Sequence, residues 1–364
     1  MSFSVEQICA WTGGRLVNAD RLGEKASEIR VGRPAPLGVS QSSELAYFFS
    51  REYEKEVMTA RCGILITAEP FFLGMQKFGL PLLGQAAIIV CADPYMAMAL
   101  LSEKFANELS SVAHVAGTSS GRQGAETQIH ASAVVDASAK VATGAKIGAH
   151  CVIEAGARIG ARTVLYPGCF VGPGVVIGED CVLFPNVALY EWTQLGNRVR
   201  IHANSTLGSD GFGYAPQVDA SKTVTGHQKI YHLGRVVVGD DVEMGANSCA
   251  DRSTMGDTII EKSAKIDNQV HLGHNARVEE GAIICGGTCL AGGAHIGRFA
   301  YVGGLTGVGN RVHVGEGAQV GALTMVTKDV PPKGTAVGNP QREHREHFRA
   351  HAALNKLVSD RKKS

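Results

Sequence analysis

An aliphatic residue returns at every sixth position over most of the second half of the chain. The period begins at Ile129 and continues through residue 212 without a slip, in hexads such as IEAGAR and LFPNVA. It resumes over 238–249 and again over 260–331. A period of six fits neither the 3.6-residue turn of an α-helix nor an ordinary alternating strand. It predicts a parallel β-helix, in which each hexad forms one short strand and one turn.

The positions within a hexad differ in character. Position one is Ile, Val or Leu, and position five is Ala, Cys, Thr or Val, so both are predicted to point into the coil. Position two is often glycine, which we attribute to a turn backbone that must be free of Cβ constraints. Three hexads close one triangular coil. Residues 18 apart in sequence are therefore expected to stack at roughly 4.8 Å, the spacing of parallel strands.

The rest of the chain divides around this repeat. We assign residues 1–115 to an N-terminal α/β domain, 116–128 to a linker of small polar residues, 129–335 to the β-helix and 336–364 to a C-terminal helical segment. The fold class is mainly β. The period fails over 213–237, which must leave the coil as an insertion, and over the shorter stretch 250–259. Long insertions in a rigid scaffold are places where function concentrates.

Composition and charge agree with this architecture and exclude several classes of function. The chain has 45 glycines in 364 residues and only two tryptophans, as tight turns around a narrow interior require. A net charge of +1 gives no field that would attract nucleic acid or an anionic membrane. We expect no transmembrane segment, because the longest apolar run, 79–91, is too short and contains Pro81. Nine scattered cysteines without an export signal predict reduced thiols in a cytoplasmic protein.

Among the thirteen histidines, His274 has the most suggestive surroundings. It occupies an outward turn position of the hexad LGHNAR, with Asp267 seven residues earlier and Gly292 eighteen residues later, on the next coil. A histidine oriented by a carboxylate, beside a glycine amide, can deprotonate an amine or hydroxyl and stabilise an oxyanion. His295 and His313 should stack. No carboxylate-flanked histidine trio accompanies them, so we predict no metal site.

Several segments resemble the UDP-3-O-acylglucosamine N-acyltransferases of lipid A biosynthesis, which are hexapeptide-repeat acyltransferases. The resemblance covers nearly the whole chain and includes the uridine-binding domain of that family, through SVEQICAWTGGRL and ELAYFFSREY (44–53). The segments in the repeat region are LGSDGFGYA (207–215), GRVVVGDDVEMGAN (234–247), DTII (257–260), IDNQVHLGHN (266–275) and CGGTCLAGG (285–293).

The resemblance implies a left-handed β-helix, a homotrimer and a specific reaction. The expected activity is transfer of a 3-hydroxyacyl chain from acyl carrier protein, as its phosphopantetheine thioester, to the 2-amino group of UDP-3-O-acylglucosamine. No bound cofactor is expected. His274 would be the general base, Asp267 would hold its imidazole in the productive tautomer, and the Gly292 N–H would stabilise the oxyanion.

The remaining roles implied by the resemblance concern binding. Tyr47 and Tyr53 would stack on uracil, with Ser50 in the place of a family asparagine. Asn268 and Arg311 would contact the sugar and diphosphate, Arg311 standing where the family has a histidine. The other residues expected to bind the sugar or diphosphate are Asp210, Phe212 and Tyr214, and those expected to bind the carrier protein are Arg342, Arg345 and Arg349.

Some alternatives stay open at this point. The basic C-terminal helix could bind the acidic carrier protein or simply cover the end of the β-helix. The reaction could be O-acyl transfer or acetyl-CoA-dependent N-acetyl transfer on the same scaffold. A non-catalytic β-solenoid scaffold is the alternative of a different class.

Overall fold

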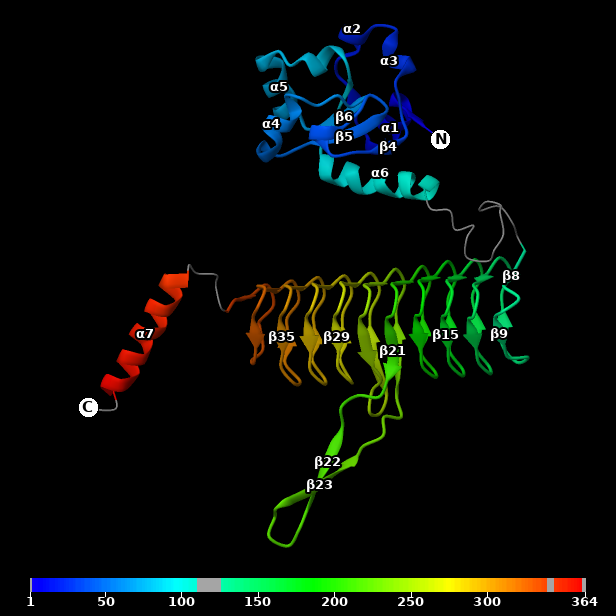
Figure 1. The fold of residues 1–364 in the computed structure, drawn as a ribbon, viewed down its shortest axis with the longest axis vertical. Helices are drawn as coiled ribbons and strands as arrows, with labels where there is room; N and C mark the ends of the chain where they lie inside the picture. The colour runs from blue at the N-terminus through cyan, green and yellow to red at the C-terminus, as the bar shows by residue number, and fades with distance from the viewer. Residues whose placement is uncertain (1, 110–125, 339–343, 362–364) are drawn as a thin grey trace. The chain divides into compact units, whose positions relative to one another are not determined.

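A computed structural model describes residues 2–109, 126–338 and 344–361 (Figure 1). The chain forms two compact units, Met1–Ser111 and Val112–Ser364. Residues 116–125 of the predicted linker lie outside the described residues.

The N-terminal unit contains a five-stranded sheet in the order β2-β7-β6-β5-β4, parallel except for β2. The predicted strands LAYFF, CGILIT and AAIIVC are confirmed as β5, β6 and β7, and the predicted helices as α1 and α6. The elements are β1 (Phe3–Ser4), α1 (Val5–Thr12), β2 (Arg15–Leu16), α2 (Ala19–Leu22), α3 (Lys25–Glu28), β3 (Arg30–Val31), β4 (Arg33–Pro34), η1 (Leu37–Val39), β5 (Glu44–Phe48), η2 (Arg51–Tyr53), α4 (Glu54–Val57), β6 (Ile64–Thr67), α5 (Glu69–Phe78), η3 (Pro81–Gly84), β7 (Ala87–Val90) and α6 (Pro94–Leu109).

Both faces of this sheet are buried. Ile64 and Ile66 of β6 pack in one apolar cluster with residues of α1 and α6, while Leu65 packs in a second cluster with residues of α4 and α5. Continuous apolar strands are what a parallel sheet covered on both faces requires. The buried strand β5 carries Tyr47, and η2, which follows it, carries Tyr53.

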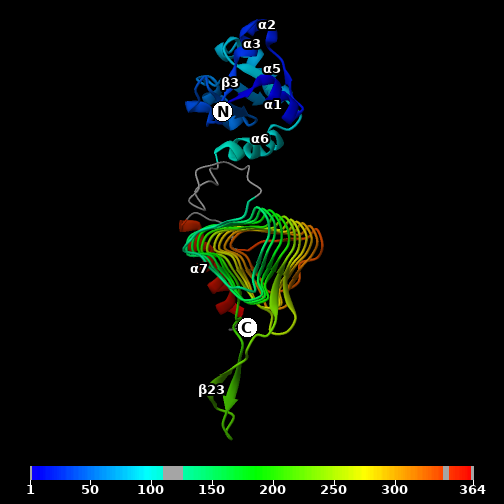
Figure 2. The same ribbon diagram turned by 90° about the vertical axis from the view of Figure 1, so that its right-hand side faces the viewer.

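The second unit is a β-helix with three parallel sheets, seen along its axis as triangular coils in Figure 2. The eleven-stranded sheet comprises β8 (Gln128–Ile129), β11 (Lys146–Ile147), β14 (Val164–Leu165), β17 (Val182–Leu183), β20 (Arg200–Ile201), β25 (Glu243–Met244), β28 (Lys265–Ile266), β31 (Ile283–Ile284), β34 (Tyr301–Val302), β37 (Gln319–Val320) and β39 (Thr335–Ala336). The ten-stranded sheet comprises β9 (Val134–Val135), β12 (Val152–Ile153), β15 (Phe170–Val171), β18 (Ala188–Leu189), β21 (Thr206–Ser209), β26 (Cys249–Asp251), β29 (His271–Leu272), β32 (Cys289–Leu290), β35 (Gly307–Val308) and β38 (Met325–Val326). The nine-stranded sheet comprises β10 (Lys140–Val141), β13 (Arg158–Ile159), β16 (Val176–Ile177), β19 (Gln194–Leu195), β24 (Arg235–Val238), β27 (Asp257–Ile260), β30 (Arg277–Val278), β33 (His295–Ile296) and β36 (His313–Val314).

The predicted stacking of residues 18 apart is confirmed. Ile147 pairs with Leu165 in parallel register, and both side chains are completely buried. Cys151 and Cys169, at position five, are also completely buried. The interior is therefore a continuous column of aliphatic and small side chains, as the hexads predict.

The structure refines the explanation of glycine at position two. At Gly160 a Cβ would lie 2.2 Å from the carbonyl oxygen of Gly178 on the next coil, so there is no space for a side chain. Positive φ occurs instead at position four, as at Arg162 (59°) and Asp180 (56°). Glycine stands at position two where the coils approach closely, as at Gly160, and position four carries the left-handed residue of the turn.

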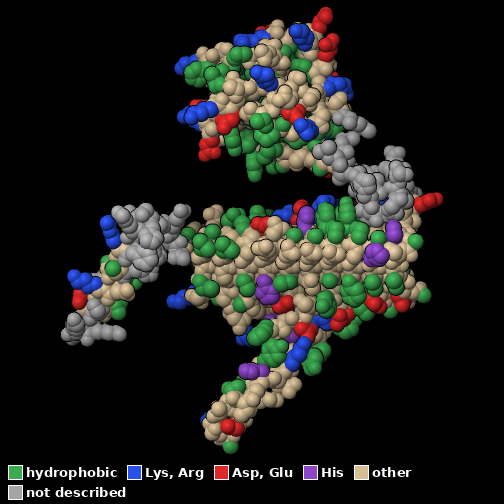
Figure 3. Space-filling model, in the orientation of Figure 1, with side chains coloured by type: hydrophobic (Ala, Val, Ile, Leu, Met, Phe, Trp, Pro, Cys, Tyr) green, Lys and Arg blue, Asp and Glu red, His purple; other side chains and the backbone are tan. Residues whose placement is uncertain are grey.

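The interruption at 213–237 is an antiparallel hairpin, β22 (Tyr214–Val218) with β23 (Val224–Lys229), which projects from the β-helix in Figures 1 and 2. The chain returns in register, because Leu195 of β19 pairs with Val238 of β24. Exposed apolar side chains gather at the hairpin base, as Figure 3 shows. They include Phe212, Tyr214, Ile230, Tyr231, Leu233 and Met255.

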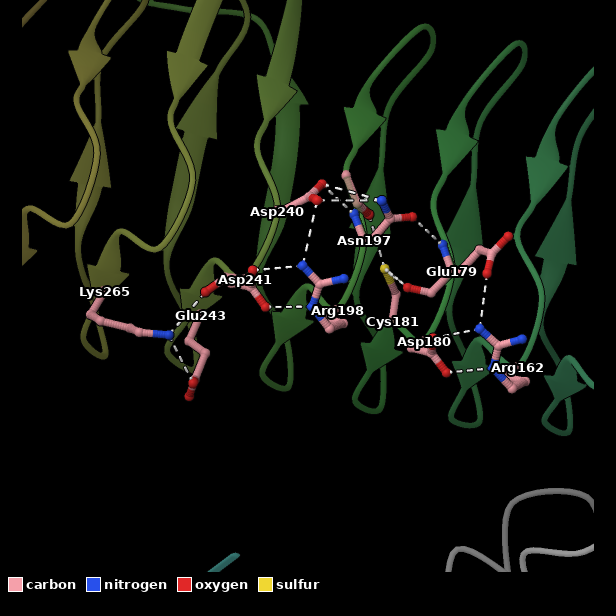
Figure 4. Close-up of polar contacts among 11 residues, drawn as sticks. Arg162, Glu179, Asp180, Cys181, Asn197, Arg198, Asp240, Asp241, Glu243 and Lys265 are labelled. Atoms are coloured by element: carbon pink, nitrogen blue, oxygen red, sulfur yellow. Dashed lines mark hydrogen bonds and ion pairs between the residues drawn. The ribbon is translucent and has the colours of Figure 1, made fainter. Parts of the chain in front are cut away.

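A ladder of ion pairs follows the turns that join the nine-stranded sheet to the eleven-stranded sheet; we call it the charged corner. Arg162 pairs with Asp180 at 2.6 Å, and Arg198 pairs with Asp241 at 2.6 Å (Figure 4). All four residues occupy position four, so 18-residue stacking places opposite charges side by side. The bidentate bonds from Arg162 and Arg198 lower the pKa of Asp180 and Asp241.

The predicted C-terminal helix is α7 (His344–Arg361). No helix in the described ranges is both long and apolar enough to cross a membrane.

Candidate functional site

The turns that join the ten-stranded sheet to the nine-stranded sheet differ from all others; we call them the hairpin corner. In successive coils this corner carries the hairpin (β21 to β24), the 252–256 excursion (β26 to β27), His274 (β29 to β30), Gly292 (β32 to β33) and Arg311 (β35 to β36). Both departures from the hexad period therefore lie beside the histidine that the sequence analysis selects.

The tautomer of His274 is fixed by its neighbour. His274 Nδ1 lies 2.9 Å from Oδ1 of Asn275. The Asn275 Nδ2 group donates to Ser253 Oγ, and Oδ1 accepts from the Thr254 N–H at 3.2 Å, so the amide has one sensible orientation. Since Oδ1 is an acceptor, Nδ1 of His274 carries the proton. Its Nε2 therefore has the free lone pair that a general base requires.

Gly292 lies directly against this nitrogen. A Cβ at residue 292 would be 2.6 Å from His274 Nε2, so only glycine leaves space for the ring. No hydrogen bond within the described ranges uses the Gly292 N–H. A base and an uncommitted backbone donor thus lie side by side, the pairing expected from their 18-residue spacing.

Within one chain Asp267 does not contact His274, so its predicted role beside the imidazole stays a prediction. Its Oδ1 accepts from Asn268 N at 2.7 Å and its Oδ2 from Gly286 N at 2.9 Å. Asp267 follows β28, whereas His274 follows β29, and successive hexads turn at different corners of the triangular coil. A separation of seven residues therefore places the two side chains at neighbouring corners. Within one chain it is Asn275 that contacts Nδ1 of His274.

Asn268 lies with Asp267, away from the hairpin corner. Its Oδ1 accepts from Ala246 N at 2.7 Å. The two residues line a groove of about 540 Å³. The other lining residues are His202, Glu243, Gly245, Lys265, Ile266, Ile283, Ile284 and Cys285.

A buried polar cluster that the sequence analysis missed lies at the base of the hairpin. The ring of His232 is 5.1 Å from that of His274, and its Nδ1 lies 3.1 Å from the carbonyl oxygen of Ile230. Nδ1 therefore carries the proton, and the buried Nε2 has no partner in the described part of the chain. Asp251 is 7% exposed; its Oδ1 accepts from Ser209 Oγ at 3.2 Å and its Oδ2 lies 3.6 Å from His271 Nε2.

Burial raises the pKa of Asp251, although the nearby His271, Ser209, His274 and His232 act in the opposite direction. The cluster could not be found from the 18-residue rule, because the hairpin and the excursion change the spacing of stacked residues.

Arg252 extends the cluster toward the preceding coil. It is 4% exposed; Nη1 donates to Glu191 Oε1 at 2.8 Å and Nε donates to the Gly208 carbonyl oxygen, while Nη2 has no partner among the described residues. Of the four buried side-chain atoms without a partner there, three belong to Thr193, His232 and Arg252. Unsatisfied buried polar groups are costly, and their concentration at one corner marks it as a functional candidate.

A nearby thiol is poorly suited to act as a nucleophile. Cys249 Sγ lies 3.0 Å from Nδ1 of His271, but burial raises the pKa of the Cys249 thiol. Burial also raises the pKa of Cys289 on the next coil but one. Reactive cysteines require a depressed pKa. Neither thiol is therefore a good candidate for a nucleophile.

The insertion residues named in the sequence analysis lie at the hairpin base. Asp210 Oδ2 pairs with Lys229 Nζ at 2.6 Å, which lowers the pKa of Asp210. Phe212 is 87% exposed, and its ring meets that of Tyr214 edge-on at 5.1 Å. Arg311 lies one coil beyond Gly292, and its N–H donates to the Gly292 carbonyl oxygen at 3.1 Å. These residues share the corner with His274.

In the N-terminal unit, Tyr47 and Tyr53 line one pocket of about 420 Å³. Burial raises the pKa of Tyr47, whose hydroxyl stays neutral, while Tyr53 is half-exposed. Ser50 begins η2, where its Oγ accepts from Glu52 N at 3.4 Å. The other lining residues are Pro34, Ala35, Pro36, Leu37, Phe49, Met98 and Ser102.

The remaining predicted residues are less informative. Arg342 lies outside the described residues; Arg345 and Arg349 belong to α7, where the side chain of Arg349 is exposed. His295 and His313 stack with centroids 4.3 Å apart, and His295 Nε2 lies 2.8 Å from Glu279 Oε1. Within the described ranges no group of three His, Cys, Asp or Glu side chains could hold a metal ion.

Comparisons with known proteins place this geometry in a family. The family model described as bacterial transferase hexapeptide (six repeats) matches residues 126–161 and 174–209. The UDP-3-O-acylglucosamine N-acyltransferase of Paraburkholderia phymatum is 42% identical over 289 residues, 79% of this chain and 74% of the relative. That of Paraburkholderia phytofirmans is 42% identical over 289 residues, 79% of this chain and 71% of the relative.

Among solved structures, the Arabidopsis UDP-N-acetylglucosamine acyltransferase aligns with a TM-score of 0.52 and 23% identity, over 61% of this chain and 76% of that one. The predicted fold class, a left-handed parallel β-helix with an N-terminal α/β domain and a C-terminal helix, is confirmed. The predicted enzyme class, an N-acyltransferase, is confirmed as well. The chain therefore belongs to the UDP-3-O-acylglucosamine N-acyltransferase family.

Proposed function

We propose that this protein transfers a 3-hydroxyacyl chain from acyl carrier protein to the 2-amino group of UDP-3-O-acylglucosamine, a step of lipid A biosynthesis. Family membership supports the acceptor, since the relatives carry that name. The observation that carries the mechanism is the position of His274 Nε2, unprotonated and against the Gly292 backbone.

In the proposed mechanism, the acceptor amine attacks the carbonyl carbon of the carrier-protein thioester while His274 Nε2 takes a proton from the nitrogen. The carbonyl oxygen becomes an oxyanion, which accepts a hydrogen bond from the Gly292 N–H. The tetrahedral intermediate then collapses, the C–S bond breaks, and the imidazolium returns its proton to the leaving phosphopantetheine thiolate. The products are an amide and a free thiol.

The acceptor requires contacts at both of its ends. Tyr47 and Tyr53 lie in one pocket, and we propose that they stack on uracil, with Ser50 at its edge. Arg311 supplies a cation for the diphosphate at the corner that carries His274. Asp210, Phe212 and Tyr214 would contact the sugar from the hairpin base.

The donor side of the proposal follows the family resemblance. Arg342, Arg345 and Arg349 would bind the acidic surface of acyl carrier protein. The enzyme would need no bound cofactor, work in the cytoplasm and form a homotrimer. In that trimer we propose that the groove at Asn268 faces the hairpin corner of a second copy, which would bring Asn268 to the acceptor.

The test is His274→Ala, assayed by mass analysis of products formed with a mixture of 3-hydroxyacyl carrier proteins. We expect kcat to fall by about 10²–10⁴-fold, the usual contribution of a general base, while binding of the UDP-sugar and the melting temperature stay unchanged. A fully active variant would contradict the role of His274.

The same assay separates the alternative functions. Transfer from acetyl-CoA in place of the carrier-protein thioester would indicate an acetyltransferase, and an ester product would indicate O-acyl transfer. A wild-type protein without turnover on any thioester would favour a scaffold.

A further inference from the structure

We propose that Asn275 and Asp251 together support His274, Asn275 by fixing its tautomer and Asp251 by balancing the positive charge that it acquires. Both are positioning residues, because neither touches the reacting atoms in the proposed mechanism. The inference rests on the proposed function of His274 as base. In a Ser-His-Asp triad a single aspartate both fixes the tautomer of the histidine and stabilises the imidazolium; here we assign these two tasks to two side chains.

The case for Asn275 is its restrained amide. Ser253 Oγ and Thr254 N–H, both in the 252–256 excursion, contact the two ends of the amide group. The backbone N–H of Asn275 donates to Thr258 Oγ1 at 2.9 Å. With Oδ1 held toward His274 Nδ1, the other tautomer of the imidazole would place two lone pairs against each other. The 252–256 excursion therefore lies next to Asn275 and fixes the orientation of its amide group.

The case for Asp251 is its burial among histidines. Asp251 occupies position two of its coil, and Ser209 opposes it across a bulge at the point where the chain leaves for the hairpin. The carboxylate is nine-tenths buried and has only one hydroxyl donor, Ser209, within the described ranges. A carboxylate kept in such a place must balance a charge, since burying it alone is costly.

The groups that face Asp251 allow that charge to be identified. His271 Nε2 of β29 lies 3.6 Å from the carboxylate, and His274 in the following turn and His232 in the hairpin are near enough to lower the pKa of Asp251. The Cys249 and Cys289 thiols also lie near it and stay neutral, because burial raises the pKa of each. Arg252, the next residue, is paired with Glu191. The histidines are therefore the available cations, and His274 is the one that gains a proton during the reaction.

The test of Asn275 is Asn275→Ala against a matched control, Asn186→Ala. Both asparagines occupy position four with φ of 61°, but Asn186 bonds to Asn204 rather than to a histidine. We expect Asn275→Ala to lower kcat by about 10–100-fold at every pH, with little change in KM. We expect Asn186→Ala to keep wild-type kcat and a similar melting temperature. Equal activity of the two variants would overturn the role of Asn275.

The test of Asp251 is Asp251→Asn, which preserves an acceptor for Ser209. Loss of the negative charge makes the imidazolium less stable, so the acid limb of the kcat/KM profile should move to lower pH while the plateau falls about tenfold. A plateau that falls with no movement of the limb would assign Asp251 a structural role and overturn the proposal.

Stability gives a readout that does not depend on turnover. Because burial raises the pKa of Asp251, its stabilising contribution is present below the pKa of unfolded aspartate and is lost as pH rises through the higher folded pKa. Asp251→Asn should therefore melt at a higher temperature than wild type at pH 7, and this difference should vanish in acid. Asp180→Asn, which loses an exposed ion pair, should not be stabilised. A lower melting temperature for Asp251→Asn would contradict the proposal.

The two levels of the proposal fail differently. A fully active His274→Ala variant would remove the base itself. If His274→Ala is inactive while Asn275→Ala and Asp251→Asn behave like wild type, the role of His274 stands and the roles of Asn275 and Asp251 are overturned.

Discussion

The charged corner and the hairpin corner are two corners of the same coil that treat their polar side chains in opposite ways. At the charged corner the arginines and aspartates of the ladder are about half-exposed, and each has an opposite charge beside it. At the hairpin corner Asp251 and Arg252 are more than nine-tenths buried, and nitrogens of His232 and Arg252 lack partners in the described part of the chain. One corner satisfies its polar groups where water can reach them, and the other withdraws them from water.

This difference separates stability from function. An exposed ion pair adds little to the free energy of unfolding, and its desolvation cost is small. A buried polar atom without a partner lowers the free energy of unfolding by about 1–3 kcal/mol. A protein retains such a cost where activity needs it. The exposed ion pairs of the charged corner can therefore be changed with small effects, and the buried polar groups of the hairpin corner cannot. The following predictions test this contrast, beginning with the largest effect.

Gly292→Ala should affect activity most. Its Cβ would lie 2.6 Å from His274 Nε2, so the ring must move away from the oxyanion donor. We expect kcat to fall by about 10²–10³-fold, the range seen when one oxyanion donor is lost. Steady-state kinetics measure this. The control is Gly338→Ala, where the nearest atom would be 3.9 Å from the Cβ. Wild-type activity for Gly292→Ala would show that the ring has space to spare.

Gly178→Ala should affect stability most at the charged corner. Its Cβ would lie 2.3 Å from the Gly196 carbonyl oxygen, and backbone atoms of a continuous sheet cannot move aside cheaply. We expect a loss of about 2–3 kcal/mol in the free energy of unfolding, measured in urea. Gly144→Asn, at position four with φ of 75°, should cost less, since asparagine tolerates that conformation. A larger loss for Gly144→Asn would contradict our assignment of the two positions.

The Arg198–Asp241 pair should contribute modestly. Both side chains are about half-exposed, so a double-mutant cycle with alanine should give a coupling energy of about 0.2–1 kcal/mol that falls as salt is added. Activity should stay at the wild-type level. A coupling energy that does not respond to salt would mean that the ladder is less exposed in the assembled protein than in one chain.

Lowering the pH should change the stability contributed by the two corners in opposite directions. Arg162 and Arg198 lower the pKa of Asp180 and Asp241, so these pairs stabilise the fold above the pKa of unfolded aspartate, about 3.9, and lose that contribution as pH falls further. We expect a change of a few tenths of a kcal/mol, absent in Arg198→Ala for its own pair. Asp251, whose pKa is raised, should show the opposite sign in melting curves between pH 3 and 7.

The sequence predicts the coil well because its repeat is local. Ile147 and Leu165 could be paired from their spacing alone, and so could His274 and Gly292. Asp267 and His274 are seven residues apart, which places them at neighbouring corners of one chain, so their predicted pairing does not follow from the stacking rule.

Asp251, His232 and Asn275 could not be found in this way. Ser209 meets Asp251 across 42 residues, Asn275 meets Ser253 across 22, and Arg252 meets Glu191 across 61. None of these spacings is a multiple of 18. They follow from where the hairpin and the excursion rejoin the coil, which the hexad pattern marks only as an interruption.

The return of the hairpin to register has a practical consequence. Stacked residues across it, such as Arg198 and Asp241, are 43 apart where an uninterrupted coil has 18, as between Arg162 and Asp180. The strands on either side nevertheless pair as if nothing had been inserted. Hairpins of other lengths or sequences could therefore be exchanged between relatives by joining them at Ser209 and Arg235. The coil would then serve as a constant frame for hairpins of different sequence.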